Sequence, residues 1–168
     1  MSSLYESVDD ATLSEIIREA EVRLEDQLAA GMAADQRALT FAGFLATAAA
    51  GGLAIMSSLK GADIRPAMIV STGFALAALL ALWSARPTRW SFRGTSPSEW
   101  LPDIEDGLSL QRSRAEMATH YSGGLKRNHA AMMRAAGAMK LSLAITAGSL
   151  VFTLAWVWVR LIWLTAST

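Results

Sequence analysis

The chain has 168 residues, 52% of them hydrophobic, and its fifteen basic side chains balance fifteen acidic ones, so the formal net charge is zero. This balance disfavours a nucleic-acid partner, which would favour a basic stripe. The absence of cysteine excludes disulfides and thiol catalysis. The acidic amino end lacks the basic-then-apolar order of a secretory signal, so no cleaved leader is expected.

Residues 1–37 are predicted to form an amphipathic helix in the cytoplasm. The stretch Thr12-Leu13-Ser14-Glu15 matches a capping box and predicts that the helix begins near it. Apolar residues then recur every three or four positions, at Leu13, Ile17, Ala20, Leu24 and Leu28. Because Gly31 costs only about 1 kcal/mol inside a helix, one long helix should continue into the first span.

Three long runs contain no ionisable side chain: residues 38–59, 66–85 and 141–159. At about 1.5 Å per residue each run crosses the roughly 30 Å hydrocarbon layer of a bilayer. The sequence therefore predicts an all-α integral membrane protein with three transmembrane helices. Residues 38–85 form a transmembrane hairpin, in which Pro66 suits the first turn of the second helix and Pro87 follows its end. Residues 141–168 hold the third helix and an outer tail.

Residues 86–140 are predicted to be a cytoplasmic loop followed by helices. Asp103 is the expected cap of a second cytoplasmic helix, weakened at Gly123 and Gly124, with apolar positions at Ile104, Leu108, Ala115, Met117 and Tyr121. The two cytoplasmic helices should pack against each other as a helical hairpin, since their apolar stripes have no other partner of matching length.

Basic residues set the predicted orientation. Twelve lie before the first span or between the second and third, two lie in the short turn between spans one and two, and one lies in the tail. The amino terminus is therefore expected in the cytoplasm and the carboxyl terminus outside. Tryptophans near the ends of spans two and three match aromatic belts: Trp83, Trp90, Trp100, Trp156, Trp158 and Trp163.

Small residues on the spans allow close approach of another helix. The positions expected in helix packing or an oligomer interface are Gly43, Thr47, Gly51, Gly52, Gly73 and Gly148. The pattern leaves open whether these contacts form within one chain or between copies, although oligomers are favoured. Hydroxyl side chains within the spans either line a pore or bond to their own helix backbone: Thr47, Ser71, Thr72, Thr146 and Ser149.

Few polar groups offer chemistry. Asp35 and Lys140 precede spans one and three at the same expected depth, so they form an interfacial ion pair or else both face lipid headgroups. His120 and His129 are nine residues apart, which is not a metal-binding spacing on a helix. No nucleophile-elbow or phosphate-loop motif is present, and neither a metal site nor catalysis is expected.

Short motifs resemble those of bacterial membrane effectors from the Pycsar antiphage systems and the related SLATT group. They are Ala34-Asp35-Gln36-Arg37-Ala38 entering the first span, Leu82-Trp83-Ser84-Ala85-Arg86-Pro87 ending the second, and Met139-Lys140-Leu141 before the third. The resemblance covers roughly residues 24–160. It implies an antiviral defence effector that oligomerises and impairs the bacterial inner membrane on a signal such as a cyclic nucleotide made by a partner cyclase.

The chain departs from many such effectors because no residues remain for a separate nucleotide-binding domain. Sensing would then fall to the cytoplasmic helices or to a soluble sensor protein. The basic residues that are either phosphate contacts or a solvated face are Arg112, Arg114, Lys126 and Arg127. The alternative function is a non-toxic accessory or structural subunit of a larger membrane complex.

Overall fold

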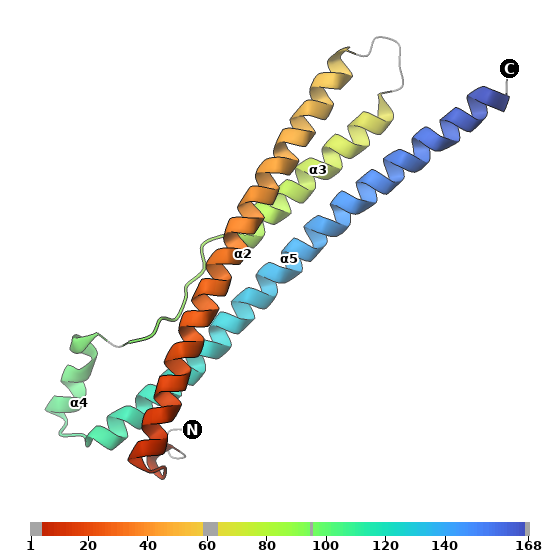
Figure 1. Cartoon of the computed structure of the whole chain (residues 1–168). Helices are drawn as coiled ribbons and strands as arrows, with labels where there is room; N and C mark the ends of the chain where they lie inside the picture. Colours follow the sequence, from red (N-terminus) through yellow and green to blue (C-terminus); the bar gives the residue numbers. More distant parts are fainter. Residues whose placement is uncertain (1–4, 59–63, 95, 167–168) are drawn as a thin grey trace. The chain divides into compact units, whose positions relative to one another are not determined.

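The computed structural model describes residues 5–58, 64–94 and 96–166. Its elements are α2 (Asp10–Ser58), α3 (Arg65–Ser84), the 3₁₀ helix η1 (Pro97–Trp100), α4 (Leu101–Glu105) and α5 (Leu110–Ala166), labelled as in Figure 1. No β-strand occurs in these ranges, so the all-α class is confirmed. Three of the helices, α2, α3 and α5, contain segments long and apolar enough to cross a membrane.

The chain divides into two compact units. The polar unit comprises Met1–Ala33 and Pro87–Met133, and the apolar unit comprises Ala34–Arg86 and Arg134–Thr168. Both α2 and α5 are unbroken and contribute one segment to each unit. Gly31 does not interrupt α2, which confirms the predicted continuous helix.

The core of the polar unit lies between α2 and α5. Its buried side chains are Leu13, Ile17 and Leu24 from α2 and Ala115, Ala118 and Tyr121 from α5. The side chains of the two apolar stripes thus form one buried cluster, which confirms that the stripes pack against each other.

The two helices of the polar unit run parallel, so the predicted hairpin geometry is wrong. Hydrogen bonds join Arg114 to Asp10 and Tyr121 to Glu21, and a third joins Gln27 to the backbone of Leu125. The sequence separation stays near one hundred residues along the pair, whereas in an antiparallel pair it would change steadily.

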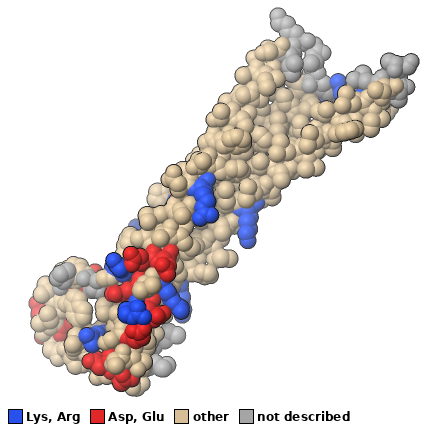
Figure 2. All heavy atoms as spheres, in the orientation of Figure 1, with Lys and Arg blue, Asp and Glu red and all other residues tan. Residues whose placement is uncertain are grey.

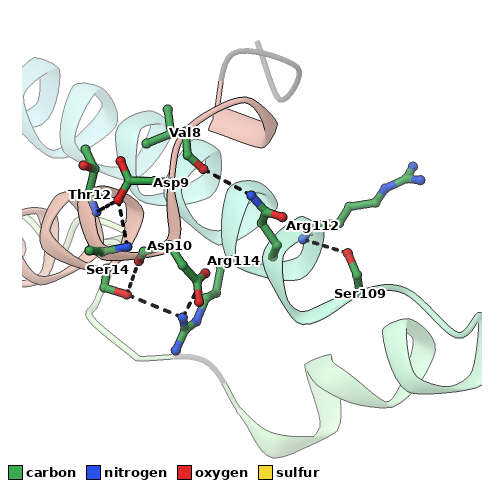
Figure 3. Close-up of polar contacts among 10 residues, drawn as sticks. Val8, Asp9, Asp10, Thr12, Ser14, Ser109, Arg112 and Arg114 are labelled. Atoms are coloured by element: carbon green, nitrogen blue, oxygen red, sulfur yellow. Dashed lines mark hydrogen bonds and ion pairs between the residues drawn. The ribbon is translucent and has the colours of Figure 1, made fainter.

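The first residues of α2 differ from the predicted capping box. The Asp9 carboxylate accepts hydrogen bonds from the backbone N–H groups of Ala11 and Thr12, at 3.1 and 3.0 Å (Figure 3). Asp9 is therefore the cap, and Thr12 already lies inside the helix. A carboxylate satisfies these N–H groups and also complements the positive end of the helix dipole, which explains the earlier start.

The helix expected from Asp103 is instead a single short helix that stops. Gly107 adopts a left-handed φ of 66°, and Leu108 N–H donates to the Asp103 carbonyl at 2.9 Å, closing the end of α4. A new helix, α5, then begins at Leu110 and passes through Gly123 and Gly124 without a break. Of the predicted apolar positions, Ile104 is wrong, because its side chain is 68% exposed.

The apolar unit packs α3 against both of its long neighbours. Its core contains Leu45 from α2 and Ala77 and Ala78 from α3, with Phe41, Phe74 and Ile145 beside them. Pro66 lies in the first turn of α3, and that helix ends at Ser84 before Pro87, as the sequence predicts. Alanines and serines rather than large side chains fill most of the α3 face, so the helix backbones approach closely.

Candidate functional site

Two of the predicted small residues, Gly52 and Gly73, form close helix contacts in the apolar unit. A Cβ added at Gly52 of α2 would collide with the Ser71 hydroxyl of α3, and one added at Gly73 of α3 would collide with the Ser149 hydroxyl of α5. Each glycine thus admits a serine side chain from the neighbouring helix directly onto its backbone. Gly52 and Gly73 act in packing within one chain.

The other small residues leave a second face of α2 open. Gly43, Thr47 and Gly51 are exposed, and nothing lies within 4 Å of a Cβ built at either glycine. Gly148 of α5 is equally open. Residues Gly43, Thr47 and Gly51, here called the open α2 face, are spaced by four and therefore lie on one side of the helix. They remain available to lipid or to another chain.

Most hydroxyl groups of the spans bond to their own helices. Thr47 donates to the Gly43 carbonyl at 3.0 Å, and Thr146 and Ser149 bond in the same way to carbonyls four residues earlier. Ser71 is the exception, because its buried hydroxyl has no hydrogen-bond partner among the described residues. The hydroxyls of Thr47, Thr146 and Ser149 therefore bond to their own helix backbone, which is one of the two alternatives given for them. Thr72 is exposed on α3.

A buried hydrogen bond joins α3 to α5 in the apolar unit. The Ser142 hydroxyl of α5 donates to the Ala77 carbonyl of α3 at 2.6 Å, and both residues are completely buried. In a lipid environment such a bond contributes about 0.6 kcal/mol on average. Together with the contact between Gly73 and Ser149, this bond fixes the rotation of α5 about its axis relative to α3.

The predicted ion pair between Asp35 and Lys140 is not formed, since no salt bridge joins them in the part of the chain that is described. Lys140 is exposed, whereas Asp35 is half-buried. Burial raises the pKa of the Asp35 carboxyl above its usual value of 3.8. The carboxylate is therefore partly desolvated just before the charge-free run that begins at Ala38.

The four predicted phosphate contacts are divided among separate partners. Arg114 reaches Asp10 at 3.3 Å and Arg112 pairs with Glu116 at 3.6 Å, and Figure 3 shows the two guanidinium groups pointing in different directions. Arg127 donates to the Ser91 hydroxyl at 3.3 Å, and Lys126 is exposed. No single cluster gathers these cations.

Charge is divided unequally between the two units. The polar unit carries thirteen acidic and eight basic residues, a net charge of −5, whereas the apolar unit carries two acidic and seven basic residues, +5. Figure 2 shows the acidic side chains gathered over the polar unit. The zero net charge of the chain hides this division. An anionic ligand on the polar unit would meet an unfavourable field.

Sequence reasoning missed a built contact in the polar unit, where residues 87–94 bind α2 and α5. The Asn128 side chain accepts from Ser91 N–H at 2.9 Å and donates to the Ser91 carbonyl at 3.0 Å. Tyr121, only 1% exposed, accepts from Gly94 N–H and donates to Glu21, both at 2.9 Å. The only signal for this contact was two polar residues among the apolar positions of a helix.

Five of the six tryptophans divide into two groups, and the sixth, Trp156, stacks against Phe152 at a ring-centroid distance of 6.3 Å. Trp83, Trp158 and Trp163 are exposed by 61% or more, in keeping with the predicted belts, and Arg86 lies 4.5 Å from the Trp83 ring. Trp90 differs, since its ring occupies the space where Gly31 lacks a side chain. Trp100 lines a cavity of the polar unit. Trp90 therefore has a packing role within the polar unit.

The histidines are apart, as expected. His120 and His129 are both exposed on the unbroken α5, and a separation of nine residues places them on opposite sides of it. Among the described residues no group of three His, Cys, Asp or Glu side chains is arranged to hold a metal ion.

Comparison of the chain with protein-family models, with curated proteins and with solved structures found no match.

Proposed function

We propose that this protein is a bacterial membrane effector that assembles into oligomers through the open α2 face and thereby impairs the inner membrane. The observation that carries the proposal is the contrast between neighbouring glycines. Gly52 contacts α3 within the chain, whereas Gly51 and Gly43 are open. In membranes, small residues spaced by four favour close helix pairs, because backbones can approach and gain van der Waals contacts.

Two further features support an effector rather than a transporter. The charge-free runs contain no ionisable residue for a proton relay or a coupled-ion site. The entry and exit motifs of the spans resemble those of Pycsar and SLATT effectors. In this proposal the amino terminus and the polar unit lie in the cytoplasm, where a signal reaches them.

The direct experiment is controlled expression in a bacterial host. The wild-type chain should arrest growth and depolarise the inner membrane. Treatment with an amine-reactive crosslinker should give covalent oligomers of the chain. Gly51→Leu and Gly43→Leu should abolish both effects. The matched control is Ala75→Leu, a small-to-large change at another exposed position on α3, which should leave both effects unchanged.

The competing function, a non-toxic accessory or structural subunit, predicts different results. Overexpression would be harmless with or without added cyclic nucleotides or a co-expressed nucleotide cyclase, and the Gly51→Leu variant would behave as the wild type. Monomeric, harmless protein under all these conditions would refute the effector proposal. Toxicity that requires a cyclic nucleotide would identify the trigger class, although the −5 charge of the polar unit weighs against direct binding of an anion there.

Orientation can be tested independently because the chain contains no cysteine. Single cysteines at Ser7, Ser58, Ser98 and Thr165 should react with a membrane-impermeant maleimide in intact cells only at positions 58 and 165. Reaction at Ser98 from outside would exclude the proposed topology, whatever the outcome of the toxicity assay.

A further inference from the structure

A cavity of about 290 Å³ lies in the polar unit between η1, α4 and α5. Its lining includes Glu99, Trp100, Asp103, Ser113, Glu116 and His120. Three separate elements each supply one carboxylate. None of the functions considered above uses this cavity.

The carboxylates of the cavity are poorly compensated by cations. Arg112 pairs with Glu116 at 3.6 Å, but no described residue makes an ion pair or hydrogen bond with the side chain of Glu99 or Asp103. Residues 96–109 contain four acidic side chains and no basic one. The cavity therefore presents a negative potential within a unit that is already negative overall.

Two other side chains point to an organic cation as the occupant. Ser113 is only 6% exposed, and its hydroxyl makes no hydrogen bond with the described residues, so a donor or acceptor is left for a ligand. Trp100 supplies an aromatic ring, and tryptophan is the side chain that attracts cations most strongly through its π face.

The spacing of the carboxylates favours an extended ligand over a metal ion. No three of the described acidic and histidine side chains are close enough together to hold one metal ion. The volume also exceeds what a single ion needs. Separated carboxylates fit a molecule whose positive charges are themselves separated by a flexible apolar chain.

We propose that this cavity binds a free aliphatic polyamine, with its ammonium groups at Glu99, Asp103 and Glu116 and its methylene chain against Trp100. The Ser113 hydroxyl accepts a hydrogen bond from an ammonium group. This site is separate from the open α2 face, so its test is independent of the assembly proposed above.

The test measures spermidine binding to the purified full-length protein in non-ionic detergent by isothermal titration calorimetry. Asp103→Asn and Glu116→Gln should each weaken binding roughly tenfold, and Trp100→Leu roughly threefold or more. The matched control is Asp106→Asn, which removes the same charge from an exposed position beyond the end of α4. That variant should bind within twofold of wild type.

Several results would overturn the proposal. Equal loss in Asp106→Asn and Asp103→Asn would show general attraction to an acidic surface. Mg²⁺ that displaces spermidine equally well at the same concentration of charge would also show general attraction to an acidic surface. Absence of heat up to millimolar spermidine, with all variants unfolding at the wild-type temperature, would exclude the site. Tighter binding of a trilysine peptide than of spermidine would exclude a free polyamine as its ligand.

Discussion

The Asn128 side-chain amide pairs with the backbone of Ser91 in both directions, accepting at 2.9 Å and donating at 3.0 Å. Asn128 is 1% exposed, so water cannot replace it. This one side chain satisfies both polar groups of a residue that belongs to no helix or strand. It thereby fixes residues 87–94 on the polar unit.

Replacing Asn128 by Leu should lower the free energy of unfolding by about 2–4 kcal/mol, because two partly buried backbone groups of Ser91 lose their partners. Asn128→Asp, which keeps only the acceptor, should lie between this variant and the wild type. The measurement is thermal unfolding in detergent, followed by circular dichroism. His129→Leu, at the exposed neighbouring position, is the control. Equal stability of the two Leu variants would contradict the role given to Asn128.

Gly73→Ala should destabilise the apolar unit by about 1–3 kcal/mol, as overpacking does in other close-packed interiors. The added methyl group would meet the Ser149 hydroxyl, and Ser149 Cβ lies 2.8 Å from the same point. Gly148→Ala, where nothing lies within 4 Å, is the matched control and should be neutral or slightly stabilising.

The Gly73 contact can also be tested by rescue. Ser149→Gly removes both atoms that collide with the new methyl group, so the double variant should recover most of the stability lost in Gly73→Ala. A coupling energy near zero in this double-mutant cycle would mean that the two helices do not meet at these residues.

Asp35 should make stability depend on pH. Burial raises the pKa of its carboxyl in the folded protein, so the folded state binds more protons than the unfolded state between 3.8 and the raised value. Stability should therefore fall as the pH rises through this window. Asp35→Asn should unfold at a higher temperature than the wild type at pH 7, and the difference should vanish near pH 3. Gln36→Asn, which has no titratable group, serves as the control; a constant offset for Asp35→Asn at all pH values would refute the prediction.

Asp9 should make stability depend on pH in the direction opposite to Asp35. Hydrogen bonds from Thr12, followed by the other backbone donors, lower the pKa of its exposed carboxyl below 3.8. The stabilising effect is therefore present above that value and is lost as the pH falls below it. Asp9→Ala should shorten α2 at its start in amide hydrogen exchange, whereas Asp9→Asn should retain the cap. If Thr12→Val has the larger effect at neutral pH, the capping assignment is wrong.

The sequence predicts the long helices well, for a simple physical reason. A run of twenty residues without charge is costly to expose to water and long enough for a bilayer, so α2, α3 and α5 are located by length alone. The stripe beginning at Leu13 and Ile17 is equally clear, since helical spacing puts its members on one face.

The rotational setting of the helices could not be predicted. Gly51 and Gly52 are both small, and only the position of Ser71 decides which of them is covered. The Ser91 and Asn128 contact joins residues far apart in sequence, and no local pattern requires it. The end of α4 depends on a left-handed Gly107, while Gly123 and Gly124, which are the same residue type, sit within a continuous helix.

The parallel arrangement of α2 and α5 brings the beginnings of two helices together. The Gln111 side chain donates to the Val8 carbonyl at 3.1 Å, across more than one hundred residues of chain. A pair of spin labels at Glu6 and Ser109 would therefore report whether the beginnings of the two helices stay together or separate. A tag fused at the amino end should therefore be carried on a long, uncharged spacer, so that it does not disturb the contact between Val8 and Gln111.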